Sequence, residues 1–157
     1  MNLPQAIADA IQPLFDVLPL KEAMGTLAPK AGASPELREV LVSVLQSEAI
    51  AARPVLQSAL WLYVDELDRS HTISQGIEDA TGSYWHGIMH RREGDFSNAH
   101  YWFRKVGAHP AMAALPGYDG HAFVDETGAA YPEDPSDLVQ RQRDEWANLF
   151  SWCASSY

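Results

Sequence analysis

From residue 34 onward, the hydrophobic and polar positions of the chain recur with the period of a helix. Ser34 followed by Pro35 is typical of a helix start, because serine caps the first turn and proline is tolerated there. The pattern predicts a helix that runs to about Ala52, since Pro54 limits it. Its apolar face is formed by Leu37, Val40, Leu41, Val44 and Leu45.

The segment before this helix has a similar pattern that is interrupted. Residues 3–18 predict one or two short helices that break at Pro13, because proline removes a backbone donor. The segment is apolar, but it carries Asp9 and Asp16 and has no basic region, unlike a signal peptide. No stretch of the chain approaches the roughly 18 apolar residues of a membrane span. We therefore expect a cytoplasmic protein.

Between Pro54 and Gly107 the pattern predicts four short helices joined by tight turns. Their sequences are "PVLQSALWLYV", "LDRSHTISQGI", "SYWHGIMHRRE" and "FSNAHYWFRKV". A shift of 29 positions superimposes the first pair on the second, which suggests two copies of one unit. The matched positions are Ser58 with Gly87, Leu67 with Phe96, Ser70 with Ala99, His71 with His100, and Ile77 with Val106.

After Pro110 the character of the chain changes. Residues 108–137 contain six acidic residues and neither Lys nor Arg, with glycines and prolines throughout. We expect an acidic loop over 108–134, in which "AFVDETGAAY" is a candidate β-hairpin. A closing helix is predicted over 135–155, since one side of it carries Leu138, Trp146, Leu149, Phe150 and Cys153.

Composition limits the class of protein. The 157 residues have the size of one domain, and 46% of them are hydrophobic, so the chain should fold. The net charge of −10 disfavours both nucleic acid and anionic membranes as partners. The single cysteine, Cys153, is expected to be a small buried hydrophobic residue. Nothing in the sequence indicates the oligomeric state.

The segment "GIMHRREGDFSNAHYWF" resembles the tetratricopeptide repeat. Small and aromatic residues match that pattern at Gly87, Gly94, Phe96, Ala99 and Phe103. The resemblance implies helical hairpins, but the spacing is short and two units are fewer than a solenoid needs. We therefore expect a compact all-α bundle with a hairpin core over 35–107. The residues with which that family grips peptide carboxylates have no counterparts here.

A second resemblance covers most of the chain. The run "HRREGDFSNAHYWFRKVGAHP", with "DELDRSHTISQ" before it, is similar to a family of short bacterial proteins with no assigned activity. This resemblance implies that the chain is related to those proteins, but it implies no mechanism.

Histidines and arginines are concentrated between residues 84 and 107. On a helix, His86, His90 and Glu93 fall within roughly 60° of one another. His100 and Arg104 lie one turn apart on the next predicted helix, and His71 is the repeat equivalent of His100. We expect a polar pocket inside an otherwise aromatic bundle, formed by His71, His86, His90, Glu93, His100 and Arg104.

Three hypotheses compete for this pocket. His86 and His90 could hold a divalent metal ion with His71 or His100 and with Glu93, because H-x-x-x-H presents both imidazoles to one ion. Arg104 and one of the adjacent Arg91 and Arg92 could instead bind an anionic small molecule or peptide carboxylate. In a third interpretation the histidines are structural residues, and the arginines pair with the acidic segment 119–137.

The second hypothesis is preferred: a binding module for an anionic small molecule or peptide. The alternative is a metal-dependent, hydrolase-type enzyme that uses His86 and His90 as ligands. No nucleophile, phosphate or dinucleotide motif is present, so whether the chain is an enzyme stays open. Because adjacent residues on a helix point about 100° apart, one of Arg91 and Arg92 is expected on the surface. The tryptophans Trp61, Trp85 and Trp102 are expected in the core.

Overall fold

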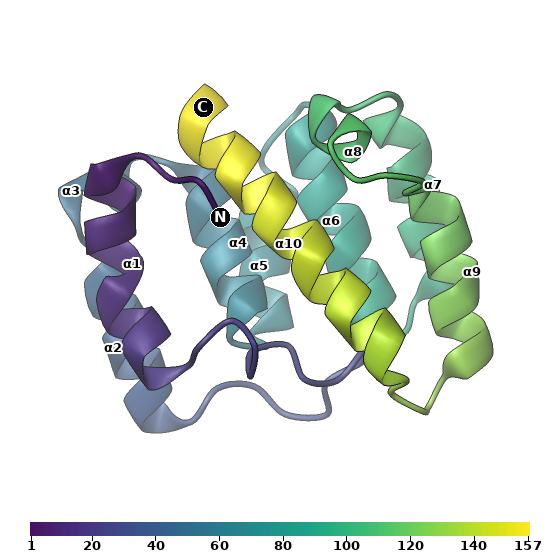
Figure 1. Cartoon of the computed structure of the whole chain (residues 1–157), viewed down its shortest axis with the longest axis horizontal. Helices are drawn as coiled ribbons and strands as arrows, with labels where there is room; N and C mark the ends of the chain where they lie inside the picture. Colours follow the sequence, from purple (N-terminus) through teal and green to yellow (C-terminus); the bar gives the residue numbers. More distant parts are fainter.

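Ten helices and no strand make up the computed structural model, which describes all of residues 1–157 (Figure 1). The all-α prediction is therefore confirmed. The helices are α1 (Gln5–Val17), α2 (Pro35–Leu45), α3 (Glu48–Ala51), α4 (Pro54–Tyr63), α5 (Leu67–Ser74), α6 (Ala80–Glu93), α7 (Phe96–Val106), α8 (Pro110–Ala113), α9 (Gly120–Ala130) and α10 (Ser136–Ser156). None of them is long and apolar enough to span a membrane.

The beginning of α2 follows the predicted cap, but the predicted end is wrong. Ser34 Oγ accepts the backbone N–H of Leu37 at 3.2 Å, as the sequence indicated. The helix then ends at Leu45, because Ser47 Oγ donates to the carbonyl of Val44 at 2.7 Å and a new short helix begins after it. The expected break at Pro13 is also absent, and α1 continues through this residue.

The predicted acidic loop contains a helix, and the candidate hairpin is wrong. Residues 120–130 form α9, whose first turn is capped by Asp119. The Asp119 carboxylate accepts the N–H groups of His121 at 2.8 Å and Ala122 at 3.0 Å. Phe123 and Val124 are adjacent and both fully buried, which the strict alternation of a half-buried hairpin strand does not allow.

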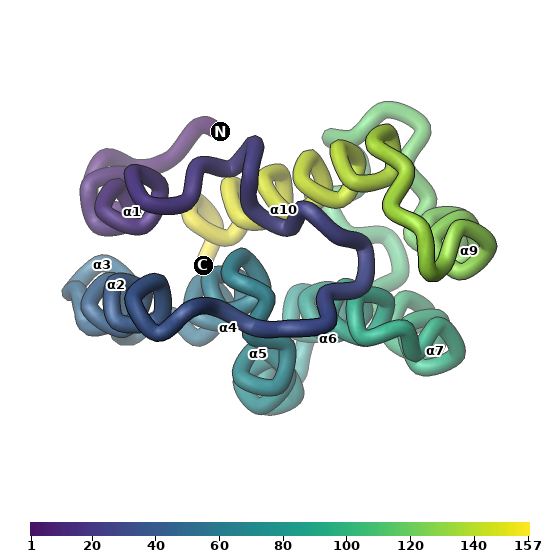
Figure 2. Tube along the Cα trace, turned by 90° about the horizontal axis from the view of Figure 1, so that it is seen from below, coloured from purple at the N-terminus to yellow at the C-terminus, as the bar shows by residue number.

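The helices form two layers. Figure 2 shows α1, α10 and α9 in one layer, and α2, α4, α6 and α7 in the other, with α5 on the outer side of the second layer. The closing helix α10 lies close to the predicted range 135–155 and crosses the bundle diagonally (Figure 1). Its Trp146 is fully buried and donates its indole N–H to the carbonyl of Ala59 at 2.8 Å.

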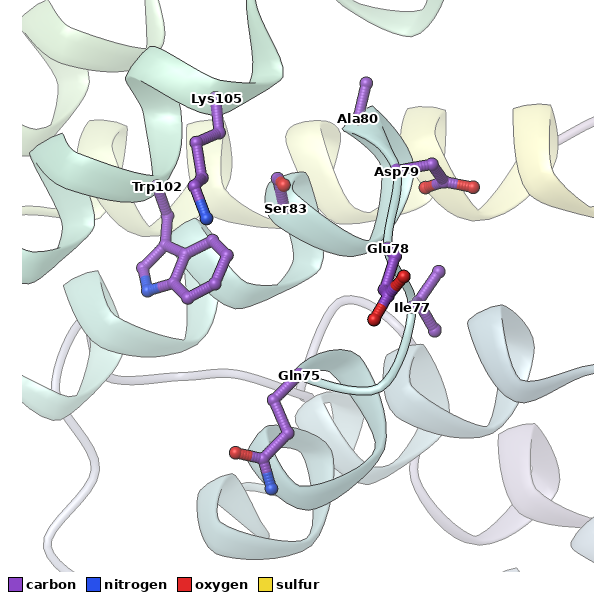
Figure 3. A pocket seen from close by; sticks show the side chains of 8 residues that line it. All are labelled: Gln75, Ile77, Glu78, Asp79, Ala80, Ser83, Trp102 and Lys105. Carbon is purple, nitrogen blue, oxygen red and sulfur yellow. The ribbon is translucent and has the colours of Figure 1, made fainter.

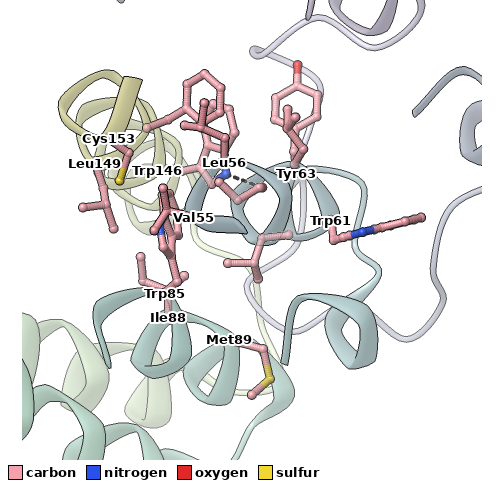
Figure 4. Packing of buried hydrophobic residues seen from close by; sticks show 14 of the residues in the cluster. Val55, Leu56, Trp61, Tyr63, Trp85, Ile88, Met89, Trp146, Leu149 and Cys153 are labelled. Carbon is pink, nitrogen blue, oxygen red and sulfur yellow. Dashed lines mark hydrogen bonds between the residues drawn. The ribbon is translucent and has the colours of Figure 1, made fainter. Parts of the chain in front are cut away.

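The main hydrophobic core lies between these layers (Figure 4). Trp85 of α6 and Trp146 of α10 are both fully buried there, with ring centroids 6.5 Å apart. Cys153 is also fully buried, as predicted, and burial raises the pKa of its thiol to about 12. Trp61 is buried, whereas Trp102 is only partly buried and lies outside this cluster.

The second helix pair, α6 and α7, packs closely along its length. Gly94, with φ of 84°, ends α6 in the left-handed conformation, and Asp95 caps α7 by accepting the N–H of Asn98 at 3.0 Å. Gly87 lies against Phe103, since a Cβ at residue 87 would be 3.1 Å from that ring. This close approach brings one face of α6 directly opposite one face of α7.

Candidate metal centre

Two histidines of α6 face α7 along a single stripe. His86 and His90 are four residues apart, so their side chains lie one above the other on the same face of the helix. Opposite them, in the antiparallel sense, stand Trp102 and Asn98 of α7. The rings of His86 and Trp102 are stacked with centroids 3.9 Å apart, and Asn98 Nδ2 lies 3.1 Å from Nε2 of His90.

The third histidine of the centre comes from α5. The ring centroid of His71 is 4.6 Å from that of His86 and 5.3 Å from that of His90, and His86 and His90 are 4.8 Å apart. One nitrogen of each ring lies within 4.8 Å of the others. His86 and His90 are only 2% and 6% exposed, whereas His71 is partly buried. The three rings thus converge in a largely solvent-excluded place between α5, α6 and α7.

Neighbouring side chains fix the orientation of the two buried rings. Ser74 Oγ donates to the carbonyl of His71 at 3.2 Å, so its lone pair is left to accept from Nδ1 of His86 at 3.4 Å. Nδ1 of His90 lies 2.9 Å from Oε2 of Glu93. Both rings therefore have a protein partner at Nδ1, as metal-binding histidines usually have at the nitrogen that does not hold the ion, while Nε2 of His90 lies beside the Asn98 carboxamide.

Burial keeps these imidazoles neutral. Loss of hydration, together with repulsion from His90 and His71, lowers the pKa of His86 to about 3. Burial also lowers the pKa of His90, although its hydrogen bond to Glu93 opposes the shift. At neutral pH each ring is neutral and has one unprotonated nitrogen, and this is the form that coordinates a metal ion.

Two predicted pocket residues lie elsewhere. His100 and Arg104 lie on a different side of α7 from Asn98 and Trp102. Each is two residues further along the helix, and two residues rotate the side-chain direction by about 200°. His100 Nδ1 is 2.8 Å from Nδ1 of His121, and its Nε2 is 2.9 Å from the carboxylate of Asp125. The structure thus brings together His71, His86, His90 and Glu93 and separates them from the other two.

The adjacent arginines Arg91 and Arg92 are both fully buried, so the expectation that one is on the surface is wrong. Arg91 forms an ion pair with Glu145 of α10, with Nη1 3.0 Å from Oε1, and Tyr118 also donates to this carboxylate. The predicted pairing of the arginines with the acidic segment 119–137 is absent for Arg91, because Glu145 lies outside that segment.

The hydrogen-bond acceptors of Arg92 also lie outside the acidic segment 119–137. It donates to the carbonyl of Leu62 at 2.8 Å and to Asp65 at 2.6 Å. Both guanidiniums are thereby held by protein acceptors. The arginine that pairs with the acidic segment is instead Arg141, whose partner is Glu126.

Three contributors to the centre were missed by sequence reasoning: Ser74, Asn98 and Trp102. Asn98 and Trp102 are four residues apart and so share a face of α7, a spacing that could have identified them once His86 and His90 were paired with that helix. Ser74 carries a weaker signal, because it only follows His71 by one helical turn.

Comparisons with known proteins found no matching family, no similar curated protein and no similar solved structure.

Proposed function

We propose that the protein binds a divalent transition-metal ion through His71, His86 and His90. The observation that carries this proposal is the convergence of three imidazole nitrogens within 4.8 Å, contributed by two helices. Imidazole suits zinc, copper, nickel and iron, and three protein ligands with an open position are typical of catalytic zinc sites.

The geometry requires only a small adjustment on binding. Tetrahedral zinc with Zn–N bonds of 2.0–2.1 Å implies nitrogens separated by about 3.3 Å, so the rings would approach one another by at most about 1.5 Å. Asn98 would give up its contact with Nε2 of His90, and its carboxamide would then lie beside the ion. Glu93 would remain on Nδ1 of His90 as the orienting carboxylate.

The arginines argue for a metal ion over an anion held by guanidiniums. Arg91 and Arg92 are buried in ion pairs, and Arg104 lies on another side of α7. The polar groups that converge there are imidazole nitrogens, of which Nε2 of His90 contacts the neutral carboxamide of Asn98. With a ligand position open, the bound ion would activate water, so a metal-dependent hydrolase is the reaction class we propose.

The tetratricopeptide resemblance remains part of the proposal. It is supported by the close packing of Gly87 on Phe103, which is the small-against-aromatic contact that the pattern implies. In the preceding pair, Ser58 and Ser70 are the equivalents of Gly87 and Ala99, and their hydroxyl oxygens lie 2.9 Å apart.

Metal content of the protein purified without a histidine tag tests the proposal. Elemental analysis and zinc titration should give about one ion per chain, and the His86→Gln/His90→Gln variant should lose it. The matched control is His100→Gln/His121→Gln, which removes two histidines outside the centre and should keep the ion. Equal metal content in both variants, with circular dichroism showing intact helices, would overturn the proposal.

A further inference from the structure

A cleft of about 580 Å³ opens beside the N-terminal end of α6 (Figure 3). In the view of Figure 3, Trp102 and Lys105 stand on one side, Glu78 and Asp79 on the other, and Ser83 between them. This volume is within the usual range for sites that hold small molecules. The cleft therefore has room for a ligand of modest size.

The cleft lies beside the histidine centre, and Trp102 contributes to both. On α6, Ser83 precedes His86 by one turn on the same face, and on α7, Lys105 follows Trp102 in the same way. Trp102 lines the cleft and also stacks on His86 at 3.9 Å. A molecule in the cleft would thus be separated from His86 by a single indole ring.

Polar groups with no protein partner face this space. Ser83 is only 7% exposed, lines the cleft, and its hydroxyl forms no hydrogen bond. The Lys105 ammonium forms no ion pair and lies 4.3 Å from the centroid of the Trp102 ring. The first turn of α6 adds the partial positive charge of a helix N-terminus. Together these groups favour one anionic oxygen group on the Lys105 side.

The opposite wall of the cleft is negatively charged, because it carries Glu78 and Asp79. Asp79 is committed to capping α6, since it accepts the N–H of Gly82 at 2.8 Å, but the Glu78 carboxylate forms no ion pair. A polyanion would be repelled by these two carboxylates. A zwitterion would place its carboxylate near Lys105 and Ser83 and its ammonium near Glu78.

We propose that this cleft binds an amino acid or short peptide as its zwitterion, next to the histidine centre. The inference goes beyond the proposed function, because Trp102 stands between the cleft and His86, and a ligand in the cleft does not have to contact the metal ion. Peptide carboxylates and ammonium groups are recognised by charge-assisted hydrogen bonds, which are the contacts that Lys105, Ser83 and Glu78 can supply.

Calorimetric titration with glycylglycine tests this inference. The full chain as purified should bind glycylglycine at least tenfold more tightly than N-acetylglycine, which lacks the ammonium, and than glycinamide, which lacks the carboxylate. Lys105→Gln and Glu78→Gln should each weaken glycylglycine binding about tenfold. The control Lys21→Gln removes a highly exposed lysine outside the cleft and should bind as the wild type does.

Repeating the titration on His86→Gln/His90→Gln separates the two proposals. Retained glycylglycine binding in a variant that has lost its metal would support the cleft independently of the ion. If the wild-type protein binds metal but not glycylglycine, the proposed ligand of the cleft is wrong and the metal proposal is unaffected. The same conclusion follows if Lys105→Gln leaves glycylglycine binding unchanged. Tighter binding of inorganic phosphate than of glycylglycine would also overturn it, because the site would then select charge and not a zwitterion.

Discussion

At the scale of single residues, the histidine centre depends on the atoms that hold each ring in place. His86 and His90 both donate from Nδ1, to Ser74 and Glu93 respectively. These contacts select the tautomer in which Nε2 is unprotonated. The two partners differ in exposure, since Ser74 is buried whereas about half of the Glu93 side chain is exposed.

Glu93→Ala should weaken zinc binding by about tenfold, because His90 loses the carboxylate that orients its ring and raises its basicity. The measurement is zinc affinity by competition with a chelating dye. Stability should change by less than about 0.5 kcal/mol, since Glu93 is largely solvated. Glu133→Ala, an exposed glutamate outside the centre, is the control and should leave affinity unchanged. Equal zinc affinity in both variants would contradict an orienting role for Glu93.

Helical periodicity was sufficient to place His86, His90 and Glu93 together, because all three lie on one helix. It misplaced His100 and Arg104, since the rotation of α7 about its axis depends on how Gly87 and Phe103 pack. The burial of Arg91 and Arg92 could not be predicted from the local sequence pattern either. Arg91 meets its partner Glu145 only across 54 positions of sequence, on the last helix.

At the scale of helices, Phe103 connects α6, α7 and α9. Its ring lies between Gly87 and Gly120, where added Cβ atoms would be 3.1 Å and 2.5 Å from the ring. Phe103 itself is buried. The two glycines therefore allow three helices to pack closely around one aromatic side chain, and this packing also sets which face of α7 meets the histidines.

Gly120→Ala should destabilise the protein by about 1–3 kcal/mol, because the new methyl group overpacks against Phe103. The free energy of unfolding from urea denaturation measures this effect. Gly128→Ala in the same helix is the control: its Cβ would be 3.4 Å from Phe96, and alanine has the higher helix propensity. Adding Phe103→Leu should recover part of the loss in the Gly120→Ala protein. Similar stability for the two alanine variants would show that the Phe103 contact is not tight.

The sequence contained a signal for α9 that composition obscured. Asp119 before Gly120 is a capping residue at a helix start, and its carboxylate accepts two backbone N–H groups. The acidic and glycine-rich character of the segment favoured a loop instead. What makes it a helix is burial of Phe123 and Val124 against other elements, which propensity alone does not reveal.

At the scale of the whole molecule, buried polar groups join the two layers. The Arg91 and Glu145 side chains are both fully buried and pair α6 with α10. His109 makes a second connection: its Nδ1 accepts the N–H of Ala111 at 3.1 Å, so its Nε2–H is directed to Thr81 of α6 at 3.2 Å. Its ring also packs on Trp152 of α10, with centroids 4.6 Å apart. His109 must therefore be neutral in the folded protein.

The stability of the protein should fall as the pH drops below about 6.5, and His109 should account for part of that fall. Burial lowers the pKa of His109, although Asp79 opposes the shift, whereas in the unfolded chain its pKa returns to about 6.5. Between these values the unfolded state binds more protons, so acid favours unfolding. The slope due to one such histidine is at most about 1.4 kcal/mol per pH unit.

Urea denaturation between pH 5 and pH 8 in the presence of a chelator measures this dependence without interference from a bound metal. His109→Gln should be less stable at pH 8, because it loses part of the contact with Trp152, yet its stability should decline less steeply toward pH 5. His86 and His90 are also buried and neutral, and they remain in both proteins, so the difference between the two slopes isolates His109. Parallel curves would mean that His109 accepts a proton within the folded protein, and the connection from α6 to α8 and α10 would then tolerate charge.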